Sequence, residues 1–128
     1  MRPAPFEYFA PRTVEDALDL LARHGGDAKL LAGGQSLVPM MNMRLVRPGV
    51  IVDLNRVPAL GDVSEEPGRL RLGALVRQHT LERDARIAAA VPLLAEAALF
   101  IGTCRRGRAA PWAGAWSTPI RPPSCPPA

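Results

Sequence analysis

The sequence predicts an α+β fold, and three features carry this prediction. Residues 28–32 and 50–54 are short apolar runs with the length expected of buried strands. A helical pattern precedes the first run, and a short segment with helical character separates the two. Two further strand-like runs follow, with a polar turn between them. Helices and strands that alternate in this way are typical of α+β or α/β domains.

The first helix is predicted to begin after Thr13. Thr13 is a good N-cap, Asp16 occupies the capping-box position, and Gly25 closes the far end. His24 falls in the last turn, where a partial positive charge suits the helix dipole. The apolar face of this helix is expected to consist of Val14, Ala17, Leu18 and Leu21.

The most informative segment is the glycine-rich connection between the two apolar runs. The strand-like run that ends at Ala32 enters a turn at Gly33 and Gly34, and a short helix is predicted from about Ser36, with Pro39 in its first turn. Adjacent glycines permit positive φ and allow a ligand to approach the backbone. The free N–H groups at a helix start form an anion site. The segment therefore predicts a strand, a phosphate-sized hole and a helix N-terminus.

The residues alone leave two other interpretations of this segment. An ordinary connection in which Gly33 and Gly34 only make a tight turn fits equally well, because short glycine-rich loops are weak evidence. A Rossmann fingerprint fits less well. Residues 33–36 lack the G-x-G-x-x-G spacing, although Asp53 lies at roughly the distance of a ribose-binding acid.

The remaining elements follow from periodicity and turn residues. The methionine-rich residues 37–44 are predicted to form the helix between the strands, residues 62–64 and 69–73 a hairpin, and the chain after Thr80 a short helix. A firmer helix is expected from Pro92 to about Ile101, with a buried side formed by Leu93, Leu94, Ala97 and Phe100. Together these elements predict one compact unit over residues 6–101. In it, the strands at 28–32 and 50–54 are expected to be adjacent in one sheet, joined through the short helix by a right-handed parallel crossover.

Composition limits the chemistry that this chain can perform. The 128 residues are enough for one small domain with a modest core. His24 and His79 stand alone, and Cys104 and Cys125 lack the spacing of a zinc site or a CxxC pair. Since no nucleophile–base arrangement is visible, we name no catalytic residue and no metal ligand. Neither a signal peptide nor a membrane-spanning run is apparent, which predicts a cytoplasmic protein.

Charge separates the chain into a body and a tail. In residues 1–102, 11 Arg and 1 Lys balance 12 Asp and Glu, so the net charge of +4 comes from four arginines in residues 103–128. The same tail holds both cysteines, both tryptophans and 6 of the 14 prolines, without hydrophobic periodicity. It is expected to be disordered. One alternative function is a small basic protein whose arginine-rich tail binds nucleic acid or another acidic partner.

The glycine-rich segment resembles a known cofactor loop. Residues 32–44 follow the pattern Ala-Gly-Gly-Gln-Ser-Leu-x-Pro-x-Met-x-x-Arg. This pattern is similar to the first flavin-phosphate loop of the FAD-binding medium subunits of molybdenum hydroxylases, of which aerobic carbon monoxide dehydrogenase is the best known. Around the loop, the segments that resemble the family are residues 6–11, 13–17, 52–54 and 73–82, the last departing from it at Val76. The resemblance covers about the first hundred residues.

The resemblance implies a fold, a cofactor and partners. Residues 1–102 would be the N-terminal lobe of a PCMH-type FAD-binding domain, with a small mixed or parallel sheet and flanking helices. The pyrophosphate of FAD would be held mainly by backbone N–H groups of Ala32, Gly33, Gly34, Gln35 and Ser36. In the family, a small iron–sulfur subunit receives electrons from a large molybdenum subunit, and the flavin passes them to an external acceptor.

The tail also resembles the family when its codons are shifted. Residues 119–128 can be encoded by DNA that reads Asp-Pro-Ala-Ala-Glu-Leu-Pro-Ala one nucleotide out of frame. The same shift converts residues 110–116 into Thr-Val-Gly-Gly-Ser-Leu, which is similar to the family's second flavin-phosphate loop. We interpret residues 103–128 as an out-of-frame tail that begins after a nucleotide lost near Gly102. The truncated chain would then be impaired or inactive alone.

Overall fold

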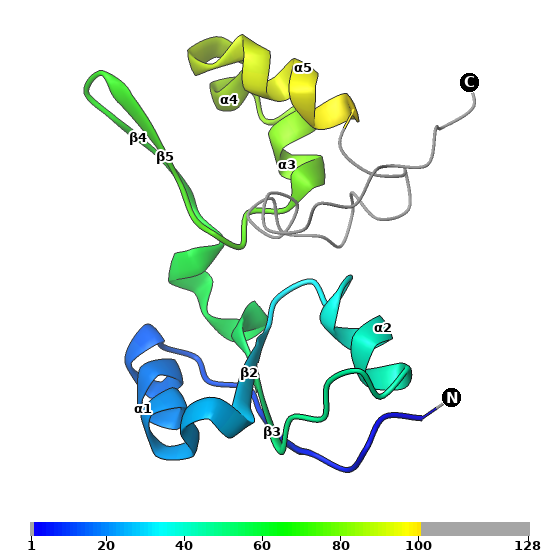
Figure 1. The fold of residues 1–128 in the computed structure, drawn as a ribbon. Coiled ribbons are helices and arrows are strands. Elements are labelled where there is room, and N and C mark those ends of the chain that lie inside the picture. Colours follow the sequence, from blue (N-terminus) through cyan, green and yellow to red (C-terminus); the bar gives the residue numbers. More distant parts are fainter. Residues whose placement is uncertain (1, 101–128) are drawn as a thin grey trace. The chain divides into compact units, whose positions relative to one another are not determined.

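The computed structural model describes residues 2–100, and their tertiary contacts form two units that divide between Leu60 and Gly61 (Figure 1). Each unit has its own cluster of buried apolar residues. The prediction of one compact unit over residues 6–101 is therefore wrong. The predicted tail, residues 103–128, lies outside the described residues.

The first unit contains a three-stranded parallel sheet with the order β1-β3-β2. Its elements are β1 (Glu7–Phe9), α1 (Val14–His24), β2 (Ala28–Leu31), α2 (Leu37–Asn42) and β3 (Val50–Asp53), with short 3-10 turns at Gly25–Asp27, Leu54–Arg56 and Pro58–Leu60. The central strand is β3. Its Val50 lies opposite Ala28 of β2, and its Asp53 lies opposite Leu31. The predicted adjacency of the two apolar runs is confirmed.

One face of this sheet packs against α1. Alternate strand residues point to the same face, and the buried cluster consists of Ala17, Ala28, Val50 and Val52, with Phe9, Leu20, Leu21 and Leu54 packed against it. Figure 1 shows α1 and α2 on opposite sides of the strands β2 and β3. Leu18 was predicted on the apolar face of α1 but is 59% exposed, because the buried stripe instead runs through Ala17, Leu20 and Leu21.

The ends of α1 follow the predicted capping residues. The Thr13 hydroxyl oxygen accepts a hydrogen bond from the Asp16 N–H at 3.1 Å. At the other end, Gly25 has a φ of +53°, and its N–H donates to the Leu21 carbonyl. The His24 ring stacks on Phe9, with 5.7 Å between the ring centroids.

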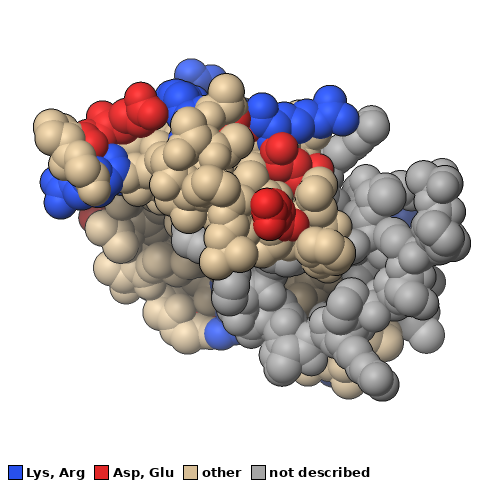
Figure 2. Space-filling view, turned by 90° about the horizontal axis from the view of Figure 1, so that it is seen from above, with Lys and Arg blue, Asp and Glu red and all other residues tan. Residues whose placement is uncertain are grey.

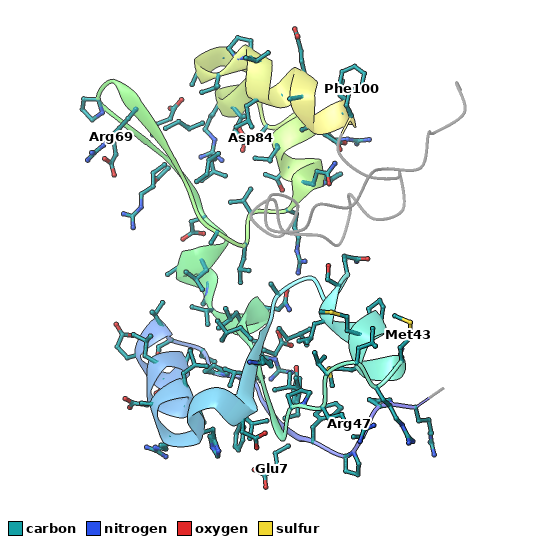
Figure 3. The ribbon with its side chains drawn as sticks, viewed as in Figure 1. Glu7, Met43, Arg47, Arg69, Asp84 and Phe100 are labelled. Atoms are coloured by element: carbon teal, nitrogen blue, oxygen red, sulfur yellow. The ribbon has the colours of Figure 1, made fainter. Side chains whose placement is uncertain are left out.

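The second unit begins with an antiparallel hairpin and continues into three helices. Its described elements are β4 (Val63–Glu66), β5 (Arg69–Leu72), α3 (Gln78–Arg83), α4 (Ala85–Ala90) and α5 (Pro92–Phe100). The hairpin was predicted, and its turn contains Gly68 at a φ of +75°. Arg69, labelled at the tip in Figure 3, pairs with Glu66 across this turn. The core consists of Val76, Leu81, Ile87 and Ala98, with Val63, Leu70, Leu72 and Leu94 packed against it.

A polar contact joins α4 to the hairpin. The Asp84 carboxylate caps α4 by accepting from the Arg86 N–H at 2.9 Å, and it also accepts two bonds from the Arg86 guanidinium. The remaining guanidinium nitrogen donates to the Val63 carbonyl at 2.9 Å. The bond from Arg86 holds the pKa of Asp84 below its ordinary value. Figure 3 shows Asp84 between α3 and α4.

The predicted buried side of α5 is partly wrong. Leu94 packs on the core and Ala98 is fully buried, but Leu93 is 75% exposed and Phe100 is 81% exposed. Figure 3 shows Phe100 at the end of α5. Because this helix is apolar on nearly every side, its periodicity did not specify which face is buried.

Candidate functional site

The predicted site residues, Ala32 to Ser36, form one loop between the end of β2 and the start of α2. The strand, turn and helix predicted from this segment are thus confirmed, and Pro39 lies in the first turn of α2. The loop leaves the carboxyl end of β2, beside the carboxyl end of β3. Ligands of parallel α/β sheets bind at this edge, so the position suits a cofactor loop.

Gly34 gives the loop its shape. Its φ is +69°, in the left-handed region that favours glycine. A Cβ atom at Gly34 would lie 3.1 Å from Val38 Cγ2 and 3.2 Å from Leu31 Cδ1. The Gly34 carbonyl accepts the Val38 N–H at 3.1 Å and so joins the turn to α2. The conformation therefore favours glycine strongly, and a side chain here would also crowd Val38 and Leu31.

The loop keeps several donors unused. Within the described part of the chain, the backbone N–H groups of Gly33, Gly34, Gln35 and Ser36 make no hydrogen bond. The Ser36 side chain does not cap α2, and the Gln35 amide reaches only the Gly33 carbonyl, at 3.5 Å. Such a run of N–H groups without acceptors fits an anion such as a phosphate.

A hydrogen-bonded group that sequence reasoning missed holds the start of this loop. The side-chain nitrogen of Asn55 donates to the Ala32 carbonyl at 2.6 Å and to Asp53 Oδ1 at 2.6 Å. Asp53 Oδ1 also accepts the Asn55 backbone N–H at 2.9 Å, and Oδ2 accepts the Tyr8 hydroxyl. The signal in the sequence was Asp-x-Asn at the end of an apolar run, which is typical of an Asx turn. Asp53, considered above only as a ribose-binding acid, instead binds side chains of its own chain.

These contacts shift two pKa values. Partial burial favours the neutral form of Asp53, but the bonds from Tyr8 and Asn55 and the charge of Arg56 outweigh it, so the pKa of Asp53 is lowered. The bond to Asp53 raises the pKa of Tyr8, and desolvation adds to that shift. At neutral pH Asp53 is therefore ionised and Tyr8 protonated.

We expect the hydrogen bonds among Tyr8, Asp53 and Asn55 to contribute less to stability at acidic pH. Because the folded-state pKa of Asp53 lies below its ordinary value of 3.8, the ionised form contributes stability that is fully present above that pH. The contribution is lost as pH falls through the folded pKa. The free energy of unfolding in urea should thus differ between the wild type and Asp53→Asn at about pH 6, and the difference should shrink below about pH 4. A difference that is constant with pH would contradict this.

The surface charges of the described residues do not gather into a basic patch on the face drawn in Figure 2. Lys and Arg side chains there alternate with Asp and Glu. A protein that binds nucleic acid through phosphate contacts needs a continuous basic surface. The tail arginines of the nucleic-acid alternative lie outside the described residues.

The described residues contain neither a cluster of metal-binding side chains nor a membrane-spanning helix. No group of three or more His, Cys, Asp or Glu side chains is arranged to hold a metal ion among residues 2–100. Over the same residues, no helix has the length and apolar character needed to cross a membrane.

Comparison with known proteins identifies the family of this chain. A family described as "FAD binding domain in molybdopterin dehydrogenase" matches residues 4–109. The chain is 46% identical over 101 residues to the 6-hydroxypseudooxynicotine dehydrogenase complex subunit alpha of Paenarthrobacter nicotinovorans, covering 79% of this chain and 34% of that protein. It is also 46% identical over 101 residues to the carbon monoxide dehydrogenase medium chain of Hydrogenophaga pseudoflava, covering 79% of this chain and 35% of the relative.

Solved structures give the same result. Carbon monoxide dehydrogenase from Hydrogenophaga pseudoflava, in a form lacking the Mo-pyranopterin moiety, matches with a TM-score of 0.86 and 41% identity over 89% of this chain and 40% of that chain. Quinoline 2-oxidoreductase from Pseudomonas putida 86 matches with a TM-score of 0.84 and 32% identity, with the same coverage. The chain spans about a third of the length of the curated relatives. None of these proteins is named as a nucleic-acid binder. The chain belongs to the family of FAD-binding domains in molybdopterin dehydrogenases.

Proposed function

We propose that the loop from Ala32 to Ser36 holds the pyrophosphate of FAD through its backbone N–H groups. The observation that carries this proposal is the set of N–H groups at residues 33–36 without an acceptor in the described structure. Their place at the carboxyl edge of a parallel sheet supports it. Each N–H bonded to a phosphate oxygen is a charge-assisted hydrogen bond, which is stronger than a neutral one.

Each loop residue has a distinct role in this assignment. Gly34 turns the chain and leaves room beside the backbone, while Ala32 fixes the start of the loop through its carbonyl. Gln35 and Ser36 supply N–H groups, and the Ser36 hydroxyl, which does not cap α2, can add one more hydrogen bond to phosphate. The bound flavin would supply the redox chemistry, so no side chain is assigned a catalytic role.

Membership of this family supports a second inference, about the larger oxidoreductase of which the chain would be part. We infer that it is part of an FAD-binding medium subunit that works with an iron–sulfur small subunit and a molybdenum large subunit in the cytoplasm. In that assembly electrons pass from the iron–sulfur clusters through FAD to an external acceptor. The relatives named above are subunits of dehydrogenases and carry this inference. The substrate is chosen on another subunit and is not specified by these residues.

We further propose that residues 1–102 are one part of the FAD-binding domain and that residues 103–128 are translated out of frame. The abrupt change in composition after Gly102 and the family-like strings in the shifted frame support this. The second phosphate loop is then missing from the protein, and affinity for FAD is weak. Sequencing the gene across the Gly102 codon and through the codons of residues 103–128 tests this directly.

A titration that compares FAD with riboflavin tests the function. Riboflavin has the same ring system but no phosphate, so any preference for FAD reports contacts beyond the ring. We expect FAD to bind the 128-residue chain at least about tenfold more tightly, as one or two charge-assisted hydrogen bonds would give. Flavin fluorescence measures both affinities, and ADP should compete with FAD. The same titration on protein from a gene with the frame restored should show much tighter FAD binding. Equal affinity for FAD and riboflavin in both proteins would refute the phosphate assignment.

A further inference from the structure

The carbonyl of Ala32 accepts a hydrogen bond from the side chain of Asn55, in the turn that follows the neighbouring strand β3. Asn55 follows β3 and donates to Ala32 O at 2.6 Å, across two segments separated by more than twenty residues. Asp53 holds Asn55, and Tyr8 of β1 holds Asp53. We propose that Asn55, supported by Asp53 and Tyr8, is a positioning residue that aims the N–H of Gly33 toward the bound phosphate. This inference rests on the proposed function of the loop.

The planarity of the peptide bond connects Asn55 to the phosphate site. The Ala32 carbonyl and the Gly33 N–H belong to one peptide unit, and in a trans peptide they point in opposite directions. No cis peptide occurs among the described residues. A hydrogen bond that draws the Ala32 oxygen toward Asn55 therefore turns the Gly33 N–H away from Asn55. Asn55 thus orients one of the four unbonded donors without touching the ligand.

Asp53 selects the orientation of the Asn55 amide. An ionised carboxylate only accepts hydrogen bonds, so the amide group must turn its nitrogen, not its oxygen, toward Asp53 Oδ1. The same nitrogen then has a hydrogen left for Ala32. Asp53 Oδ1 also accepts the Asn55 backbone N–H at 2.9 Å, which fixes the backbone from which this side chain extends.

Tyr8 completes the group from the other side of the sheet's central strand. Tyr8 lies opposite Ile51 of β3, so its side chain shares a face with Asp53, two residues further on. Its hydroxyl donates to Asp53 Oδ2 and leaves Oδ1 to Asn55. The line of contacts therefore runs from β1 through the end of β3 to the first peptide of the loop. Because all three side chains lie on a partly exposed surface, each bond has a modest effect, and a graded series of variants should resolve them.

The test uses the 128-residue chain and two independent readouts. The first is the Gly33 amide signal in a ¹⁵N–¹H spectrum without ligand, and the second is FAD affinity by fluorescence. Asn55→Asp, which keeps the shape but removes the donor, should move the Gly33 signal and weaken FAD binding about tenfold. Asn55→Ala should act in the same direction. Tyr8→Phe should cause a smaller change, about twofold to threefold, since Asn55 keeps its bond to Asp53.

Thr13→Ala is the matched control. It removes one exposed side-chain hydrogen bond of the same unit, the one from the Asp16 N–H at the start of α1, and so lowers stability. Its Gly33 signal and FAD affinity should match the wild type. If Thr13→Ala moves the Gly33 signal as much as Asn55→Asp does, or if neither Asn55 variant moves it, the inference is wrong.

The two readouts separate this inference from the proposed function. If the wild type does not prefer FAD over riboflavin, the function fails, while the Gly33 signal still reports whether Asn55 orients that peptide. If the wild type prefers FAD and the Asn55 variants bind it equally well, the function stands and the positioning role of Asn55 is refuted.

Discussion

Replacing Gly34 with valine is expected to weaken FAD binding about a hundredfold. Gly34 has a φ of +69°, a conformation that costs an L-residue roughly 1–2 kcal/mol. Its new Cβ would also meet Val38 Cγ2 at 3.1 Å and Leu31 Cδ1 at 3.2 Å, and a β-branched side chain adds two more carbon atoms. The two methyl groups can shift to relieve these contacts, but relief of the strained φ moves the turn itself, and the N–H groups on either side of it move as well. With two donors lost, affinity should fall about a hundredfold.

Three comparisons make this result specific to the loop. Gly26→Val places the same side chain at a glycine in the same unit where no atom lies within 4 Å of the new Cβ, and FAD binding should be unaffected. Gln35→Ala removes a side chain but keeps its N–H, so the loss should be small. Gly33→Val, which blocks the approach of the phosphate to the backbone, should be more damaging than Gln35→Ala. Circular dichroism confirms that each variant is folded, and a folded Gly34→Val protein that binds FAD normally would refute the assignment.

The secondary structure of the first unit was predictable because its signals are local. The two apolar runs are too short for typical helices, which favours buried strands, and the caps Thr13 and Gly25 marked the ends of the helix before them. The glycine-rich turn was predicted for the same reason, since glycine adopts the positive φ found at position 34 without strain. The parallel pairing of β2 and β3 followed from the short helix between them.

The division into two units was not predictable from periodicity. Hydrophobic patterns show which residues are buried but not which others they are buried against. Ala28 and Ile87 are equally plausible members of one core in the sequence, and the structure places them in separate clusters. The prediction of the buried face of α5 was wrong for a related reason. Leu93 and Leu94 are identical residues, and only the position of the neighbouring helices distinguishes them.

The Tyr8, Asp53 and Asn55 group was missed because its contacts are distant in sequence. Tyr8 and Asp53 are 45 positions apart, and only the order β1-β3-β2 brings them together. The loop residues could be named from a motif, whereas their supporting side chains depend on strand register. Whether Ala32 to Ser36 bind FAD stays a prediction.

Ile87→Ala is expected to cause the largest loss of stability in the second unit. The Ile87 side chain is fully buried in α4, in a cluster with Val76, Leu81 and Ala98. Removing three carbon atoms from such a position loses their transfer free energy and leaves a cavity, which together cost about 2–5 kcal/mol. Because a small domain has only about 5–15 kcal/mol in total, amide hydrogens of α3 and α5 should exchange many times faster in this variant. Leu93→Ala removes the same number of carbons from the exposed side of α5 and should change stability by less than about 0.5 kcal/mol. If the two variants exchange at equal rates, Ile87 does not lie in the core of this unit.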